Sequence, residues 1–444
     1  MNWLELDRTY CWHPFTQAHT AAPAINMVRG QGSYLFDENG RPYLDAISSW
    51  WVNLHGHAHP VIAQAIADQA HQLEHVMFAG ITHPPAIILA QQLIARAPKP
   101  LQYVFYTDNG STAVEVALKM ACQYWRNQGS TRTRFLAFDG AYHGDTFGAM
   151  ATGKSSGFYT PFTDWLFEVD FLPYPATWDG HHPESIEKQA LDALDVYLNT
   201  YGNTLVAFIL EPLVQGASGM RMARPHFLRK AIARVQAQGI PVIFDEVMTG
   251  FGRTGSFFAA EQIGLTPDIL CLSKGLTAGF LPMGAAIAQP HIYEAFLDND
   301  IGKALLHGHS YMANPLGCAA ASASLQVFDQ EATLTRIQTL IQIQRSLLNT
   351  LAHHPAIRHT RQCGTITAFD ITTNDSTYNA SAGLWLREKM RERNILLRPL
   401  GNTVYLLPPY CITDAELHSI YQHLQEVLDQ WSTSSTITTS TDLF

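Results

Sequence analysis

Two side chains of opposite charge, Lys274 and Asp245, stand where they could hold a ligand between them. Asp245 follows the apolar run Val242–Phe244, and Lys274 comes shortly after the apolar run Ile269–Leu272. Short apolar runs are typical of strands that are buried on both faces of a parallel sheet. Ligands of such sheets bind at the carboxyl ends of the strands, so we expect both side chains to face one crevice. A plain ion pair is the alternative, because ion pairs also occur where no catalysis takes place.

The surroundings of Lys274 favour an amine that has lost its proton. The stretch "CLSKGLTAGFLPMG" (271–284) places Lys274 among small residues, and its glycines let other groups approach closely. A lysine in such a cleft has a reason to be deprotonated, and a neutral amine can form a Schiff base. Asp245 could then pair with a protonated ring nitrogen. A surface lysine in a loop is the alternative.

Two further stretches supply groups that suit a phosphate and a flat ring. The stretch "YTDNGSTAVEVALKMA" (106–121) predicts a strand, a tight turn and a helix, which would place Gly110 and Ser111 at a helix N-terminus that can bind phosphate. Ordinary N-capping by the hydroxyls of this turn explains it nearly as well. Tyr142, after the strand predicted at Arg134–Phe138, could cover an aromatic ring. Together with Lys274 and Asp245, these groups describe a site for pyridoxal 5'-phosphate.

Three other motifs suggest a ligand site but lack the context or the spacing that such a site needs. The stretch "GAMATGKS" (148–155) fits the phosphate-loop pattern, but no buried strand precedes it and Gly157 would interrupt a following helix. The stretch "GFGRTG" (250–255) fits a dinucleotide pattern, yet two acids stand just before it, where a pyrophosphate would lie. The histidines of "HGHAHP" (55–60) have no common zinc spacing, so turn or packing roles are favoured. We expect no nucleotide site and no metal site.

The central part of the chain predicts an α/β domain. Apolar runs that read as strands alternate with helical stretches, and this alternation is typical of a mostly parallel sheet. The helix predicted over Ser111–Trp125 carries its apolar residues on one face. The expected strands are Tyr103–Tyr106, Arg134–Phe138, Leu205–Leu210, Val242–Phe244 and Ile269–Leu272.

The two ends of the chain predict one smaller domain beside the large one. The first 60 residues read as short strands and turns, with a hairpin around the turn dipeptide Asn39-Gly40. The C-terminal part reads as a long polar helix followed by strands near 365–371 and 404–408. The expected division is 1–60 and 325–431 for the small α+β domain, 61–324 for the large domain, and 432–444 for a frayed tail of low complexity.

Composition limits the classes of partner. The chain has 444 residues and a net charge of −10, and it contains no basic run, which argues against nucleic acid or an anionic membrane surface. Its six cysteines are scattered without a C-x-x-C pair, as is typical of free thiols in a reducing compartment. No stretch approaches the ~18 apolar residues of a membrane span, and residues 1–15 lack the apolar core of a signal peptide. We expect a cytoplasmic protein that acts on small molecules.

These motifs resemble those of the class III (ω-type) aminotransferases. The resemblance covers about residues 10–425, which is nearly the whole chain. The stretches that carry it are "WHPFTQ" (12–17), "SSWWVNLHGH" (48–57), "HVMFAGITHPPA" (75–86), "AYHGDTFGAM" (141–150), "EPLVQGASGMRM" (211–222), "DEVMTGFGRTG" (245–255) and "RPLGNTVYLLPPY" (398–410).

The resemblance implies a fold-type I fold, with a large domain around a mostly parallel sheet of the seven-stranded type and a smaller α+β domain. It implies pyridoxal 5'-phosphate as the cofactor and Lys274 as the lysine that binds it and shuttles the proton. Ser310 matches a hydroxyl that reaches the phosphate of the neighbouring subunit, which implies a homodimer with shared active sites. The other cofactor-binding positions that it implies are Gly110, Ser111, Tyr142, Asp245 and Glu211.

The same resemblance implies a set of substrate-binding residues. Arg398 matches an arginine that binds the substrate carboxylate, a task that suits the planar fork of the guanidinium. Phe15 stands where the best-known members have tyrosine, and Gly308-His309-Ser310 stands where they have Gly-Pro-Thr. The substrate-binding positions that the resemblance implies are Phe15, Trp50, Trp51, Arg253, Gly308 and Arg398.

Two features narrow the choice within the class. The Trp50-Trp51 pair and "FAGITHPPA" are most similar to members that convert 8-amino-7-oxononanoate to 7,8-diaminononanoate in biotin synthesis. The amino donor stays open between S-adenosylmethionine and lysine, because Phe15 removes a phenol beside the substrate. Three alternatives also stay open. They are an ω-aminotransferase of the ornithine, 4-aminobutyrate or β-amino acid type, a non-catalytic pyridoxal-phosphate-binding regulator, and a structural homologue without cofactor.

Overall fold

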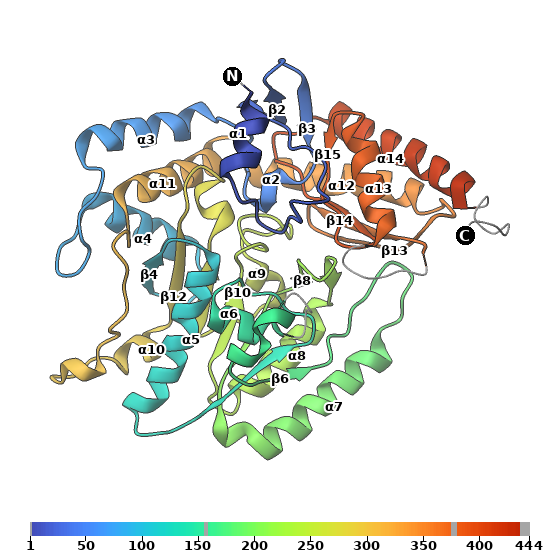
Figure 1. The fold of residues 1–444 in the computed structure, drawn as a ribbon. Helices are drawn as coiled ribbons and strands as arrows, with labels where there is room; N and C mark the ends of the chain where they lie inside the picture. The colour runs from blue at the N-terminus through green and yellow to red at the C-terminus, as the bar shows by residue number, and fades with distance from the viewer. Residues whose placement is uncertain (1, 155–158, 374–379, 436–444) are drawn as a thin grey trace.

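The fold is built around a large central sheet. The structure is a computed structural model, and it describes residues 2–154, 159–373 and 380–435. The sheet has seven strands in the order β4-β12-β11-β10-β7-β5-β6. Its strands β4, β12, β10 and β6 are labelled in Figure 1. Among the seven strands only β12 runs antiparallel to its neighbours, which confirms a mostly parallel sheet. The strands are β4 (Tyr103–Thr107), β5 (Arg134–Phe138), β6 (Val169–Leu172), β7 (Leu205–Leu210), β10 (Val242–Asp245), β11 (Ile269–Leu272) and β12 (Gly284–Ala288).

All five strands predicted from apolar runs lie in this sheet, and two further strands were not predicted. The missed strand β12 has the sequence GAAIA, whose small residues carry little strand signal. The missed strand β6, VDFL, carries a half-buried acid and lies at the edge of the sheet. Apolar runs therefore identify the central strands better than an edge strand or one built of small residues.

Helices cover both faces of the sheet, because successive residues of a buried strand point to opposite faces. In β10, Ile243 packs in one apolar cluster with α5, whereas Val242 and Phe244 pack in a second cluster with α8. The helix predicted at Ser111–Trp125 is confirmed as α5. The helices of this part are α3 (Pro60–Gln72), α4 (Pro84–Arg96), α5 (Gly110–Asn127), α6 (Phe147–Thr152), α7 (Glu184–Tyr201), α8 (Pro225–Gln236), α9 (Ala259–Ile263), α10 (Pro290–Glu294) and α11 (Pro315–Gln330).

The two ends of the chain meet in two smaller sheets. One has the order β1-β2-β3-β15, and its β15 pairs in parallel with β3, with Ile395 opposite Leu44. The predicted hairpin around Asn39-Gly40 is confirmed, since β2 and β3 are antiparallel neighbours. The other sheet has the order β13-β14-β16. The elements are β1 (Met27–Gln31), β2 (Tyr34–Asp37), β3 (Pro42–Asp45), β13 (Ile357–Cys363), β14 (Ile366–Ile371), β15 (Ile395–Leu396), β16 (Thr403–Leu406), and the helices α1 (Trp3–Tyr10), α2 (Ser48–Trp51), α12 (Thr333–Leu351), α13 (Ser381–Arg391) and α14 (Asp414–Ser435).

This pairing brings the blue N-terminal and red C-terminal segments side by side (Figure 1). It supports the predicted small domain, whose exact boundaries stay a prediction. Residues 432–435 of the predicted tail belong to α14, and 436–444 lie outside the described residues.

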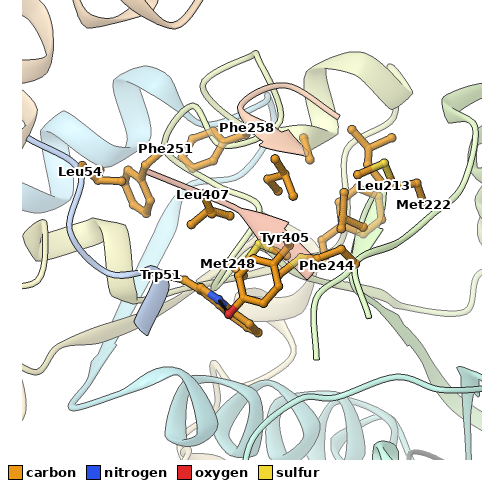
Figure 2. Packing of buried hydrophobic residues seen from close by; sticks show 14 of the residues in the cluster. Trp51, Leu54, Leu213, Met222, Phe244, Met248, Phe251, Phe258, Tyr405 and Leu407 are labelled. Atoms are coloured by element: carbon orange, nitrogen blue, oxygen red, sulfur yellow. Dashed lines mark hydrogen bonds between the residues drawn. The ribbon is translucent and has the colours of Figure 1, made fainter. Parts of the chain in front are cut away.

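An apolar cluster joins the small sheets to the central sheet. Figure 2 shows Trp51, from one end of the chain, beside Tyr405, from the other end, and their ring centroids are 6.0 Å apart. Leu54, Leu407 and Phe244 of β10 belong to the same cluster. Burying one large apolar side chain contributes roughly 1.5–3 kcal/mol, so a cluster of this size fixes the two parts relative to each other. The cavity described below opens beside this cluster, and its shape depends on that packing.

Two of the motifs that we set aside, "GAMATGKS" and "GFGRTG", have residues that are buried in the fold. Residues 148–152 of "GAMATGKS" lie in α6 rather than in a loop after a strand. In "GFGRTG", Phe251 and Arg253 are buried. Within the described ranges, no group of three or more His, Cys, Asp and Glu side chains could hold a metal ion. Across the same ranges, every helix is too short or too polar to cross a bilayer.

Candidate active site

A cavity of about 600 Å³ opens at the carboxyl ends of the central strands. Asp245 ends β10, and Lys274 follows the neighbouring strand β11, with Asp245 opposite Cys271 in the pairing. Both side chains line this one cavity, as expected for a parallel sheet. The other predicted cofactor-binding residues on its wall are Gly110, Ser111, Tyr142 and Glu211, and Trp51 of the substrate set also lines it.

Lys274 is held in a strained conformation at the base of the cavity. It begins a short 3-10 turn, Lys274–Thr277, and its φ of 44° is in the left-handed region that non-glycine residues rarely adopt. The preceding Ser273 fixes this turn by donating from Oγ to the Met283 carbonyl at 2.6 Å. Burial lowers the pKa of Lys274, although Asp245 and Glu211 oppose that shift. The side chain therefore has the lowered proton affinity that a nucleophilic amine needs.

Asp245 pairs with a histidine rather than with the lysine. His143 Nδ1 lies 2.8 Å from Asp245 Oδ2, and both side chains are buried. The other carboxylate oxygen accepts the backbone N–H of Val247 at 3.0 Å. Among the described residues no salt bridge joins Asp245 to Lys274, so the plain ion pair considered as an alternative is not formed. The sequence alone suggested no role for His143, although its place after a strand end beside Tyr142 is the signal that could have identified it.

The adjacent acid, Glu246, has a different environment. Its carboxylate accepts the backbone N–H groups of Ala259 and Ala260, at 2.7 and 2.9 Å, and so caps the start of α9. Burial raises the pKa of Glu246 to about 8. Glu246 is absent from the cavity wall, so of the two consecutive acids only Asp245 faces the candidate site.

The phosphate site predicted at Gly110 and Ser111 is formed by the start of α5. Asn109 caps this helix together with Thr112, which leaves the hydroxyl of Ser111 free of the capping role that we considered for it. That hydroxyl instead contacts Thr146 Oγ1 at 2.7 Å on the cavity wall. A Cβ at Gly110 would lie 2.6 Å from Val247, so close packing requires glycine there. The first N–H groups of a helix have no partner inside it and attract anions.

Tyr142 and Glu211 form the adjoining wall. The Tyr142 hydroxyl donates to Asp145 at 3.1 Å, and its backbone N–H donates to Glu211 at 3.0 Å. The other oxygen of Glu211 accepts the N–H of Gly216 at 2.9 Å. Burial, more than any neighbouring charge, raises the pKa of Glu211 to about 7. Glu211 thus fixes the backbone that carries Tyr142.

Three of the predicted substrate residues gather beside a second cavity. The Cζ of Arg398 lies 4.3 Å from the ring centroid of Trp50, and the Phe15 ring centroid is 5.7 Å from the same ring. Phe15 and Arg398 line this cavity of about 680 Å³, formed by the N-terminal segment and α13. Because Trp50 and Trp51 are adjacent, the chain connects this cluster directly to the wall of the first cavity.

The remaining predicted residues lie away from both cavities. Arg253 is 1% exposed and donates to the backbone carbonyls of Pro408 and Asn53, at 2.9 and 3.0 Å. Its contacts are those of a buried structural arginine, and it is absent from the walls of both cavities. Gly308 and Ser310 lie on an exposed segment, also outside both walls. Within one subunit the structure therefore does not place these three residues at the site.

The residues of the first cavity fit pyridoxal 5'-phosphate. A buried amine with a lowered pKa, a buried carboxylate and a helix N-terminus surround one space. These are the groups that the aldehyde, the ring nitrogen and the phosphate of this cofactor require.

The chain is similar to known transferases over almost its whole length. A family model described as "Aminotransferase class-III" matches residues 15–428. The adenosylmethionine-8-amino-7-oxononanoate aminotransferase of Synechococcus elongatus is 52% identical over 423 residues, which cover 95% of this chain and 99% of the relative. The enzyme of the same name from Helicobacter pylori is 37% identical over 438 residues, or 97% and 98% of the two chains.

Solved structures agree with the predicted fold. A crystal structure of adenosylmethionine-8-amino-7-oxononanoate aminotransferase from Methanocaldococcus jannaschii superimposes with a TM-score of 0.91 at 35% identity, over 96% of this chain and 98% of that one. An omega transaminase from Pseudomonas jessenii, in complex with PMP, also gives a TM-score of 0.91, at 27% identity, over 97% and 99% of the two chains. The predicted fold-type I architecture is confirmed by these likenesses.

Proposed function

Because the chain belongs to the class III aminotransferases, which depend on pyridoxal 5'-phosphate, we propose that it aminates 8-amino-7-oxononanoate to 7,8-diaminononanoate in biotin synthesis. The observation that carries the chemistry is the shared cavity of Lys274 and Asp245 at the ends of neighbouring strands. The observation that favours this substrate is the 52% identity to a relative named for it. The fold alone does not identify the substrate. The aminotransferase structure named for 8-amino-7-oxononanoate and the omega transaminase structure both have a TM-score of 0.91.

The bound cofactor supplies an aldehyde that takes up the amino group and a ring that withdraws electrons from the reacting carbon. Lys274 would hold the aldehyde end of the cofactor through Nζ, and the same amine would serve as the general base and acid for the proton at the reacting carbon. Its lowered pKa suits that work, because a base must be unprotonated when it acts. Asp245, whose Oδ2 lies 2.8 Å from His143 Nδ1, would keep the ring nitrogen protonated. Gly110 and Ser111, at the start of α5, would bind the phosphate, and Tyr142 would cover the ring.

The second cavity holds the far end of the substrate. Arg398 binds the terminal carboxylate, and its guanidinium is oriented by the ring of Trp50 at 4.3 Å. Phe15 adds an apolar surface beside Trp50 for the aliphatic chain. The amino donor is S-adenosylmethionine or lysine, and Phe15 lacks the hydroxyl that would bind a polar donor at this point.

The functional unit is a homodimer with shared sites. Ser310 lies on an exposed segment away from its own subunit's cavity, which supports a role for its hydroxyl at the phosphate bound by the partner subunit. Exposed apolar residues on and near the same segment, such as Leu306 and Tyr311, need a covering surface. The proposed location is the cytoplasm, and the free thiols of Cys271 and Cys318 suit that reducing compartment.

A comparison of amino donors tests this proposal. The purified holoenzyme is mixed with S-adenosylmethionine or with lysine, and the loss of the visible band of the lysine-bound cofactor is followed. We expect one of these donors to bleach the band, and 8-amino-7-oxononanoate then to restore it with formation of 7,8-diaminononanoate. Bleaching by ornithine, 4-aminobutyrate or a β-amino acid, without turnover of the oxononanoate, would instead identify another ω-aminotransferase. Lys274→Ala should lose the band, and Lys230→Ala, a change at an exposed lysine of α8, should keep it.

A further inference from the structure

The adjacent residues Trp50 and Trp51 face two different sites. The Lys274 amine lies 4.7 Å from the ring centroid of Trp51, whereas the Arg398 guanidinium lies over the ring of Trp50. The backbone achieves this separation in a tight turn. Ser48, Ser49 and Trp51 have φ values of 52°, 58° and 66°, and Trp50 between them has −125°. Left-handed conformations in three non-glycine residues of four persist only where the surroundings hold them.

The side chain of Asp45 holds this turn through hydrogen bonds. It is fully buried, and its Oδ1 accepts the N–H of Ile47 at 3.1 Å. Its Oδ2 accepts both the N–H and the hydroxyl of Ser49, at 2.6 and 3.2 Å. The Asp45 carboxylate therefore holds Ser49, the residue directly before Trp50. Its negative charge makes these hydrogen bonds stronger than hydrogen bonds between neutral groups.

His57 holds Asp45 in turn. His57 Nε2 lies 2.9 Å from Asp45 Oδ2, and its side chain is 10% exposed. Its Nδ1 accepts the amide of Asn53 at 3.1 Å, so Nε2 is the nitrogen that donates to Asp45. The backbone of His57 pairs with Gly32, which ties this histidine to the first hairpin. These contacts give a role to the "HGHAHP" stretch, for which the sequence suggested only turns or packing.

The two tryptophans depend on this network to different degrees. Trp51 has further anchors, because its Nε1 donates to the Tyr405 hydroxyl at 2.9 Å and its carbonyl accepts from Arg253. The contacts of the Trp50 ring, in contrast, are with Arg398 and Phe15, two residues on the surface of the second cavity. Loss of the Asp45–His57 contact would therefore move Trp50 more than Trp51.

We propose that Asp45 and His57 are positioning residues that set Trp50 against Arg398 and thereby determine the affinity for a substrate carboxylate. The choice of substrate rests on the proposed function, but the placement of Trp50 does not. The network acts on the turn and not on the cofactor, so its loss affects substrate binding while the lysine-bound cofactor stays in place.

Paired variants of His57 test the proposal. His57→Leu removes the donor to Asp45, whereas the amide of His57→Gln can still donate to it. Calorimetry with the holoenzyme should give a Kd for 8-amino-7-oxononanoate that rises about tenfold or more in His57→Leu and stays within about threefold of wild type in His57→Gln. The visible cofactor band should be unchanged in both, and a crystal structure of His57→Leu should show the Trp50 ring displaced from Arg398.

Three outcomes would overturn the proposal. They are a His57→Leu protein with an unchanged Kd and an unmoved Trp50, an equal loss of affinity in both variants, and a loss of the cofactor band in parallel with the loss of affinity. Should His57→Leu not fold, Ser49→Ala decides, because removing this one hydroxyl should raise the Kd about twofold to fivefold and an unchanged value contradicts the role. A wild-type holoenzyme that does not bind 8-amino-7-oxononanoate would disprove the substrate, while the crystal structures would still decide the placement of Trp50.

Discussion

His143 holds the carboxylate of Asp245 through a contact of 2.8 Å between Nδ1 and Oδ2, deep in the wall of the cavity. The next residue, Glu246, turns away from the cavity and caps α9 through Ala259 and Ala260. Two consecutive buried acids at the end of one strand thus have separate partners and separate tasks. This contrast offers an experiment in which each acid is the control for the other.

Asp245→Asn should damage catalysis, and Glu246→Gln should damage only stability. The amide introduced by Asp245→Asn cannot supply the negative charge that keeps a ring nitrogen protonated, so we expect kcat to fall roughly 100-fold or more. In Glu246→Gln an amide N–H would face a backbone N–H, which should cost about 1–3 kcal/mol of unfolding free energy. Steady-state rates, cofactor content after dialysis and thermal unfolding separate the two effects. Full activity in Asp245→Asn would show that the charge of Asp245 has no role in catalysis.

His55 should make the protein less stable as the pH falls. Burial, followed by the charge of His59, lowers the pKa of His55 from 6.5 to about 3, so the folded protein keeps this side chain neutral. Between these two values the unfolded chain binds a proton that the folded protein does not bind, and stability must decrease with decreasing pH. From about pH 7 to about pH 5 we expect this group to remove about 2 kcal/mol of unfolding free energy.

His55→Gln is the matched variant for that measurement. Glutamine can still contact Ser324, which lies 3.2 Å from His55 Nε2, but it does not titrate. Denaturant unfolding of wild type and variant at both pH values gives the difference directly. Equal losses of stability in the two proteins would show that His55 is charged, or exposed, in the folded state.

Local patterns of the sequence predict the central strands and the site that their ends form. Apolar runs mark β10 and β11, and neighbouring parallel strands end at the same edge of a sheet. Asp245 and Lys274 could therefore be placed together from the sequence alone, and the structure agrees. The start of α5 could also be predicted from the sequence, because a turn with glycine and hydroxyl residues precedes an amphipathic stretch.

Long-range contacts could not be predicted in this way. Arg253 looks like a pocket residue by motif, but carbonyls of segments about 200 and 155 positions away bind its guanidinium in the core. The opposite orientations of Trp50 and Trp51 depend on backbone angles that no periodic pattern encodes. His143 contacts Asp245, which lies 102 positions away in the sequence. Such residues act through partners that only the fold brings near.

Arg398 should determine affinity for the carboxylate end of the substrate. Arg398→Met removes the charged fork that lies 4.3 Å from the Trp50 ring centroid, so we expect KM for 8-amino-7-oxononanoate to rise about 10- to 100-fold. An aliphatic amino ketone without a carboxylate should react equally well with both proteins. Arg358→Met, at an exposed arginine of β13, is the control and should leave KM unchanged. A KM that rises equally for both substrates would mean that Arg398 shapes the cavity and does not bind the carboxylate.

Two inactive variants should restore activity when they share a dimer. Ser310 lies outside its own cavity, so a bulky Ser310→Trp change should block the site of the partner, whereas Lys274→Ala inactivates the site of its own chain. A mixed dimer then has one intact site. Random pairing makes half of the dimers mixed, so the co-expressed variants should show about a quarter of wild-type activity. Lys274→Ala with Asp245→Asn is the matched control, since both changes act within their own chain and no intact site can form. Recovery in the control, or none in the first pair, would contradict sites shared through Ser310.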